Sequence, residues 1–176
     1  MKANNGFLIL NKPAGLTSFK VLRELGKRIP EIKKLGHAGT LDAFATGVLI
    51  CLAGTYTNLS NYFMAEDKHY RACIEFGKET DTLDPEGNLV KTGAVPDIAQ
   101  VQWALEQSKG KIMQVPPQYS ALHCGGKRAY ERARKEEVFE LPPRQVTIYD
   151  ISLEDWTPPY AVITVHCSKG TYIRAL

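Results

Sequence analysis

A single carboxylate in a glycine-rich turn is the feature of this sequence best suited to catalysis. Asp42 lies within residues 36–49, GHAGTLDAFATGVL, between His37 and an apolar run. A carboxylate can act as a nucleophile when it stays ionised in a site closed to water, and a hydrogen-bonded arginine keeps it ionised. We therefore interpret Asp42 as a candidate nucleophile on a rigid turn.

Two further side chains suit the same chemistry. Arg174 follows an apolar run in the segment CSKGTYIRAL and is the best-placed partner for a carboxylate. Tyr70 offers a flat face for stacking a base and a hydroxyl that can move a proton. Each residue also has a purely structural interpretation, as a turn residue, a surface charge or a core tyrosine, and spacing alone leaves both interpretations open.

A basic segment interrupts the regular pattern at residues 114–144. It opens and closes with paired prolines and carries tyrosines beside a cluster of cations, which includes Lys127, Arg128 and Arg132. Cations with aromatic rings favour phosphate contacts and stacking on a folded RNA, whereas a charge run with interleaved glutamates is also typical of a solvated helix face. We expect a projecting, partly helical insertion whose cations are candidates for RNA binding, and the charge run alone leaves both interpretations open.

The sequence favours chemistry without a metal or cofactor. The four histidines are scattered, and the four cysteines form no C-x-x-C pair, so we expect buried free thiols in a reducing compartment and no zinc site. No phosphate-binding G-x-x-x-x-G-K-[ST] motif and no G-x-G-x-x-G motif after a strand are present. Isomerisation or hydrolysis is the reaction class that remains.

Size and charge restrict the class of protein further. The 176 residues are 44% hydrophobic, enough for one globular domain, and the net charge of +3 does not by itself indicate a polyanion partner. No run approaches the roughly 20 apolar residues that span a bilayer, and no signal peptide is recognisable, so a cytoplasmic location is expected.

Periodicity predicts the elements that position these residues. Alternating or continuous apolar runs predict strands, and apolar residues at helical spacing predict helices, one starting at Thr17 or Ser18 and ended by Pro30, one around residues 59–63, and one capped by Asp97 and Gln100. The predicted strands are residues 6–10, 47–53, 69–77, 145–153 and 161–168. Strands outnumber helices, which predicts an α+β fold on a mixed, mostly antiparallel sheet with flanking helices.

The ordered motifs resemble the TruB/dyskerin-type pseudouridine synthases over essentially the whole chain. The matching segments are NKPAGLTSF, GHAGTLDAFATGVL, HYRACIEFGKETDTLDPEG, VPPQYSAL, GGKRAYERAR and CSKGTYIRAL. The resemblance implies the pseudouridine synthase fold with a thumb-like insertion and the conversion of uridine 55 in the T loop of tRNA to pseudouridine. It implies no cofactor, since substrate and product are isomers, and a monomer that needs no obligate protein partner and no membrane.

The same resemblance implies a role for individual residues. Asp42 matches the nucleophile, Tyr70 the stacking tyrosine and Arg174 the arginine that pairs with the aspartate. His37 matches a histidine that assists base flipping and Tyr172 a tyrosine that contacts substrate. Asp84 would orient Arg174.

Some residues depart from the family pattern. Ala43 replaces a proline that usually follows the nucleophile, whereas Asn58 and His123 replace lysines, and such losses of cations can weaken RNA binding. Because family members continue past CSKGTYIR, we expect residues 1–176 to be a catalytic domain truncated at its C-terminus. Two alternatives stay open: a non-catalytic module that binds or folds tRNA, and a synthase subunit directed by a guide RNA.

Overall fold

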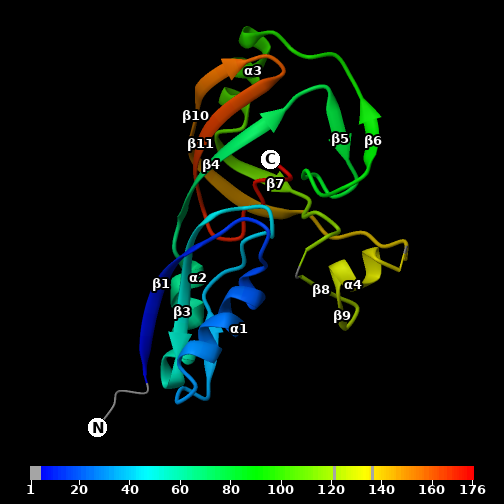
Figure 1. Ribbon diagram of the computed structural model, residues 1–176. Helices are drawn as coiled ribbons and strands as arrows, with labels where there is room; N and C mark the ends of the chain where they lie inside the picture. The colour runs from blue at the N-terminus through cyan, green and yellow to red at the C-terminus, as the bar shows by residue number, and fades with distance from the viewer. Residues whose placement is uncertain (1–4, 121, 136) are drawn as a thin grey trace. The chain divides into compact units, whose positions relative to one another are not determined.

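The computed structural model describes residues 5–120, 122–135 and 137–176, and Figure 1 shows the order of its helices and strands. The chain divides into two compact units, Met1–Glu66 and Asp67–Leu176. Each unit has its own main sheet with a core packed against it, and each is described by itself.

The first unit is a three-stranded antiparallel sheet with one face covered by a helix. Its strand order is β1-β3-β2. The elements are β1 (Gly6–Lys12), α1 (Ser18–Arg28), β2 (Leu35–His37), β3 (Gly47–Ala53), the 3-10 helix η1 (Gly54–Leu59) and α2 (Ser60–Ala65). Leu22 of α1 packs with Leu49 and Cys51 of β3, so the apolar stripe of the helix forms the core with this sheet.

The predicted capping of the first helix is confirmed. The Thr17 side chain accepts a hydrogen bond from the backbone N–H of Lys20, and α1 ends ahead of Pro30, which cannot continue a helix. The strand predicted at 47–53 also has the expected limits. Its burial is less complete than expected, because Val48 is largely exposed.

The second unit is built on a curved four-stranded antiparallel sheet (Figure 1). Its strand order is β4-β11-β10-β7, and the inward side chains of the central strands make the core around Ile148, Ile163 and Val165. The elements are β4 (Lys68–Glu75), β5 (Lys78–Thr80), β6 (Leu89–Thr92), α3 (Ile98–Gln107), β7 (Gly110–Gln114), β10 (Arg144–Thr157) and β11 (Tyr160–Cys167). The predicted capping box of α3 between Asp97 and Gln100 is present.

The residues between β7 and β10 form a small substructure. They contain the two-stranded hairpin β8 (His123–Cys124) and β9 (Lys127–Arg128) followed by α4 (Ala129–Ala133). A separate apolar cluster, Ala129 and Ala133 with Phe139 and Leu141, packs beneath them. The insertion therefore has its own minimal core, and its predicted end residues Gln114 and Arg144 belong to β7 and β10.

The fold class expected from the sequence, α+β with mostly antiparallel sheets, is confirmed, and the described strand pairings are all antiparallel. The expectation that all four thiols are buried is wrong. Cys51 and Cys167 are buried, and burial raises the pKa of both thiols, whereas Cys73 is exposed on the outer face of β4 and Cys124 is half-buried. Strand alternation places Cys73 outward because Ala72 and Ile74 point inward.

Candidate functional site

The turn that carries Asp42 connects β2 to β3 and is anchored on both sides of the carboxylate. On one side, the Ser18 hydroxyl accepts a hydrogen bond from the Leu41 N–H (2.9 Å) and donates one to the Leu41 carbonyl (3.2 Å). On the other side, the Ala43 carbonyl accepts from the Gly15 N–H at 2.8 Å. The residues before and after Asp42 are thus both held by hydrogen bonds, which fix the backbone of Asp42 between them.

Lys12 provides a second anchor for this turn. Its side chain is fully buried, and its ammonium group donates to the carbonyls of Pro13 (2.8 Å), Leu16 (2.6 Å) and Ala43 (3.2 Å). A buried ammonium is tolerated only when its hydrogen bonds are satisfied, so these carbonyls are held around it. Ala43, which departs from the family pattern, contributes through its backbone, and this contact does not require a proline.

The hydrogen bonds of Ser18 give a stability prediction for the turn. Ser18→Ala removes both contacts with Leu41, and we expect it to destabilise the first unit by about 1–3 kcal/mol, since a backbone N–H and C=O lose their partner. Urea unfolding measures the change. Thr46→Ala removes a hydroxyl from an exposed residue of the same turn and is the control; equal losses for the two variants would contradict the anchoring.

His37 lies at the end of β2, where the turn begins. Its Nδ1 is 2.7 Å from the Gly39 carbonyl, and because a carbonyl only accepts, Nδ1 carries the hydrogen. In the neutral ring Nε2 then has a free lone pair, and the half-buried imidazole is held in one orientation.

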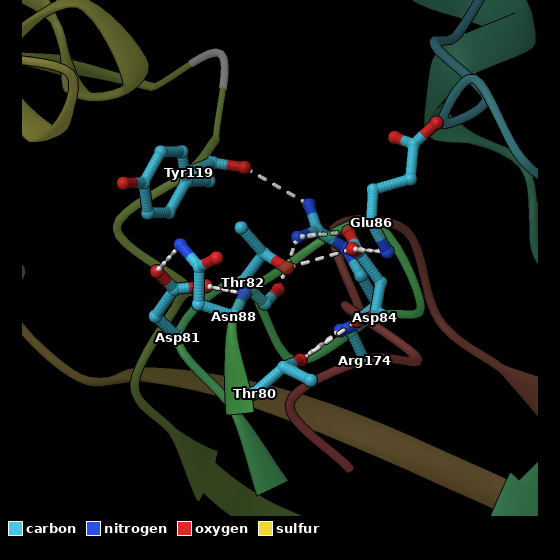
Figure 2. Close-up of polar contacts among 8 residues, drawn as sticks. All are labelled: Thr80, Asp81, Thr82, Asp84, Glu86, Asn88, Tyr119 and Arg174. Atoms are coloured by element: carbon cyan, nitrogen blue, oxygen red, sulfur yellow. Dashed lines mark hydrogen bonds and ion pairs between the residues drawn. The ribbon is translucent and has the colours of Figure 1, made fainter. Parts of the chain in front are cut away.

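Arg174 and Asp84 form a buried ion pair in the second unit, the contact that the family resemblance implied. Figure 2 shows the guanidinium surrounded by acceptors. Its Nη1 donates to Asp84 Oδ2 at 3.2 Å and to the Thr82 carbonyl at 2.7 Å, and its Nη2 donates to the Tyr119 carbonyl at 2.9 Å. Both side chains are less than 10% exposed, at 8% and 7%. The interior position excludes water from this pair, so the guanidinium is held as a fixed charge.

The loop between β5 and β6 is shaped to present Asp84. Asp84 Oδ1 accepts from the Thr82 hydroxyl (2.7 Å) and the Glu86 N–H (3.0 Å). The Thr80 hydroxyl donates to the Asp84 carbonyl and accepts from the Asp84 N–H. Gly87 is needed here because a Cβ at this position would lie 2.1 Å from the Thr82 hydroxyl oxygen. The reverse turn predicted from DPEG is confirmed, and it orients a carboxylate (Figure 2).

The two candidate tyrosines lie at different places in the second unit. Tyr70 is on the inward face of β4 and packs against the main core. Tyr172 lies in the turn that leads to Arg174, and the Arg144 guanidinium stacks over its ring at 4.8 Å. The structural interpretation of Tyr70 as a core residue is therefore correct for its packing, and its proposed contact with a base is a separate hypothesis.

The cations of the insertion differ in how they are held. Lys127 and Arg128 lie on the exposed strand β9, and Lys127 also has an ion pair with Glu137 at 3.7 Å. Arg132 points inward: it bonds Glu137 at 2.7 Å and lies over the Phe139 ring at 4.6 Å. This hydrogen bond lowers the pKa of Glu137. Arg132, which we expected to bind RNA, therefore contributes to the internal packing of the insertion.

Two of the other residues that depart from the family pattern can also be located. Asn58 lies in η1, where its side-chain oxygen accepts from the Lys34 ammonium at 3.3 Å. A cation is thus present beside the position where the family usually has lysine. His123 is an exposed residue of β8.

The scattered histidines include one unexpected pair. His69 and His166 are cross-strand partners on β4 and β11, with their rings stacked at 4.0 Å. In the part of the chain that the structure describes, no group of three or more His, Cys, Asp or Glu side chains is arranged to hold a metal ion. The described helices also include none long and apolar enough to cross a membrane.

The sequence interpretation missed several residues that hold the site together. Lys12 and Ser18 anchor the Asp42 turn, and Gln114 and Arg144 hold the segment before Arg174. Their signal in the sequence is weak, because a polar residue at the end of a strand or the start of a helix is usually exposed. Only the position of Lys12 and Ser18 within the family motif NKPAGLTSF could have indicated a special role.

The anchored turn of Asp42 and the buried pair of Arg174 and Asp84 both lie in sequence motifs that resemble those of the pseudouridine synthases. The family model described as the TruB family pseudouridylate synthase, N-terminal domain, matches residues 27–173, and this chain belongs to that family.

Curated relatives and solved structures agree with this assignment. The tRNA pseudouridine synthase B of Borreliella burgdorferi strain ZS7 is 45% identical over 98% of this chain, and that of Caldanaerobacter subterraneus is 46% identical over 98%. The chain spans 62% and 61% of the length of these two relatives. The solved structure "Crystal Structure of a Cbf5-Nop10-Gar1 Complex" is 26% identical, with a TM-score of 0.69, and the match covers 98% of this chain and 42% of that chain.

Proposed function

We propose that the protein isomerises uridine 55 in the T loop of tRNA to pseudouridine. Membership of the TruB family, with relatives named tRNA pseudouridine synthase B at about 45% identity, carries the proposal. The hydrogen-bonded turn around Asp42 supports this proposal, because a nucleophile needs a fixed position. We also propose that the enzyme acts in the cytoplasm.

The reaction breaks one bond and makes another within the same nucleotide. The N1–C1′ glycosidic bond is cleaved, the uracil turns, and C5 bonds to C1′ while its hydrogen is released and N1 gains one. A base cannot turn while stacked, so the uridine is flipped into a pocket. Because atoms and electrons balance without an oxidant or energy source, the reaction needs no cofactor.

We assign the roles of the residues as follows. Asp42 acts as the nucleophile, attacking C6 of the base or C1′ of the ribose, or it promotes elimination to a glycal. Arg174, oriented by Asp84, is the charge partner of the aspartate, and Tyr70 stacks on the base. His37 assists flipping, and Tyr172 contacts the substrate.

The experiment that tests the function uses T-arm RNA labelled with tritium at C5 of the target uridine. Tritium released into water counts the C5–C1′ bonds formed, and mass spectrometry after nuclease digestion locates the modified nucleotide. Release from bare T-arm RNA is expected with the full-length protein. No release above an RNA-only control would overturn the proposal.

We propose that the insertion grips the T arm through the exposed cations of β9. Replacing Lys127 and Arg128 by Gln should weaken tRNA binding. It should also make the decline of log K with log salt less steep, by about 1–2 in slope, because up to two phosphate contacts are lost. Arg132 is left unchanged because it packs inside the insertion. Fluorescence anisotropy across a salt series measures the slope, and Lys91→Gln with Lys111→Gln is the control of equal charge. If the slope stays at the wild-type value, RNA binds elsewhere.

The two alternatives predict different outcomes in the same assay. A module that only binds or folds tRNA would bind the T arm without releasing tritium. A guide-dependent synthase would be inactive on bare RNA and active with a guide and accessory proteins. The similarity to Cbf5, which was solved in a complex with Nop10 and Gar1, is the observation that supports this alternative. The curated relatives favour the stand-alone enzyme.

A further inference from the structure

Gln114 holds the backbone of the segment that presents Arg174. Its side-chain amide donates from Nε2 to the Tyr172 carbonyl at 3.0 Å and accepts at Oε1 from the Tyr172 N–H at 2.9 Å. The residue is only 4% exposed and ends strand β7. The backbone N–H and C=O of Tyr172 are thus both hydrogen-bonded by the Gln114 side chain, as a neighbouring strand would bond them.

The held residue lies at the junction of two turns. The first turn is closed by the Thr171 N–H and hydroxyl, both of which donate to the Ser168 carbonyl. The second is closed by the Ala175 N–H, which donates to the Tyr172 carbonyl at 3.2 Å, and it encloses Arg174. Outside regular strands and helices, such turns depend on side-chain contacts for a fixed conformation.

A second side chain supports the same segment from the neighbouring strand. Arg144 is the cross-strand partner of Gln114 in β10. Its Nη2 donates to the Gly170 carbonyl, and its guanidinium lies over the Tyr172 ring at 4.8 Å. Gly170 has a φ of +79°, which favours glycine, so the chain turns sharply where Arg144 holds it.

We infer that Gln114 is a positioning residue for pseudouridine formation, acting through the backbone of Tyr172 on the placement of Tyr172 and Arg174. This inference rests on the function proposed above. A glutamine is suited to the task because one planar amide supplies a donor and an acceptor side by side, whereas a carboxylate supplies only acceptors. Gln114 itself touches no reacting atom.

The inference predicts that Gln114→Ala slows the chemical step more than it weakens binding. Because small displacements of reacting groups are costly, we expect the single-turnover rate on T-arm RNA to fall by about 10- to 100-fold while the Kd for tRNA stays within about 3-fold. The comparison uses the full-length protein at a temperature where both variants are folded by circular dichroism. Gln114→Glu should be equally slow at a pH where the introduced carboxyl is ionised, since a carboxylate cannot donate to the Tyr172 carbonyl.

A second measurement reports on the clamp without any activity. The amide hydrogen of Tyr172 should exchange with solvent at least about 10-fold faster in Gln114→Ala, because its acceptor is removed. Ile163→Val is the matched control: it lowers stability through the core of the same sheet, at a side chain outside the clamp, and should change neither the Tyr172 exchange nor the rate.

The outcomes separate this inference from the proposed function. If the wild-type protein is active and Gln114→Ala keeps the wild-type rate, the positioning role alone is overturned. The same holds if Ile163→Val, which only lowers stability, slows the reaction as much as Gln114→Ala does. A wild-type protein that forms no pseudouridine overturns the function, and the positioning role with it. A slow variant with intact binding and rapid Tyr172 exchange supports the inference.

Discussion

Asp42→Asn should abolish pseudouridine formation while tRNA binding stays within a few fold. The amide has the shape of the carboxylate but no negative charge, so it cannot attack carbon or promote elimination, and loss of a nucleophile costs about 10⁴-fold or more in rate. The hydrogen bonds of the Leu41 and Ala43 backbones do not involve the Asp42 side chain, so they keep the turn in place. Tritium release in single turnover measures the rate.

The control for this experiment is Glu31→Gln, which makes the same change of charge at an exposed residue of the first unit. It should leave the rate unchanged. Persistent activity in Asp42→Asn, after mass spectrometry has excluded deamidation back to aspartate, would show that another group is the nucleophile.

Arg174→Met should both destabilise the second unit and remove activity. Removing the guanidinium leaves the Asp84 carboxylate buried without its charge partner and takes a donor from the carbonyls of Thr82 and Tyr119. Loss of one member of a buried pair costs about 3–5 kcal/mol. Chemical denaturation followed by circular dichroism measures the free energy of unfolding.

Two further variants identify the cause of that loss. Arg174→Met combined with Asp84→Asn should recover part of the stability, because no unpaired charge remains, so the two changes are not additive. Arg71→Met makes the same substitution at the exposed ion pair with Glu154, where a change of only about 0.5 kcal/mol is expected. If Arg71→Met and Arg174→Met cost the same, burial of the pair does not determine its strength.

The elements of this fold that are determined locally could be predicted from the sequence. Thr17 caps α1, the Asp97 and Gln100 pair caps α3, and the strand from residue 47 to 53 has the expected limits. Each depends on residues close together in the chain, whose hydrogen bonds or side-chain period need no distant partner. The exposed position of Cys73 follows from the same alternation.

The internal role of Arg132 could not be predicted in this way. In the sequence it is one cation in a basic run, and its contacts with Glu137 and Phe139 depend on how the insertion folds back on itself. The roles of Ser18 and Lys12 were missed for the same reason, because they bind a turn more than 20 residues further along the chain.

The sequence by itself determined the family, the α+β class and the residues proposed for catalysis, because ordered motifs and the periodicity of apolar residues are properties of the chain. The tertiary structure decided how these residues are held. Gln114 meets Tyr172 across 58 positions, and Arg174 meets Asp84 across 90. Such contacts form only when the sheet brings distant strands and loops together, and a side chain's partner at that distance is set by packing, not by local sequence.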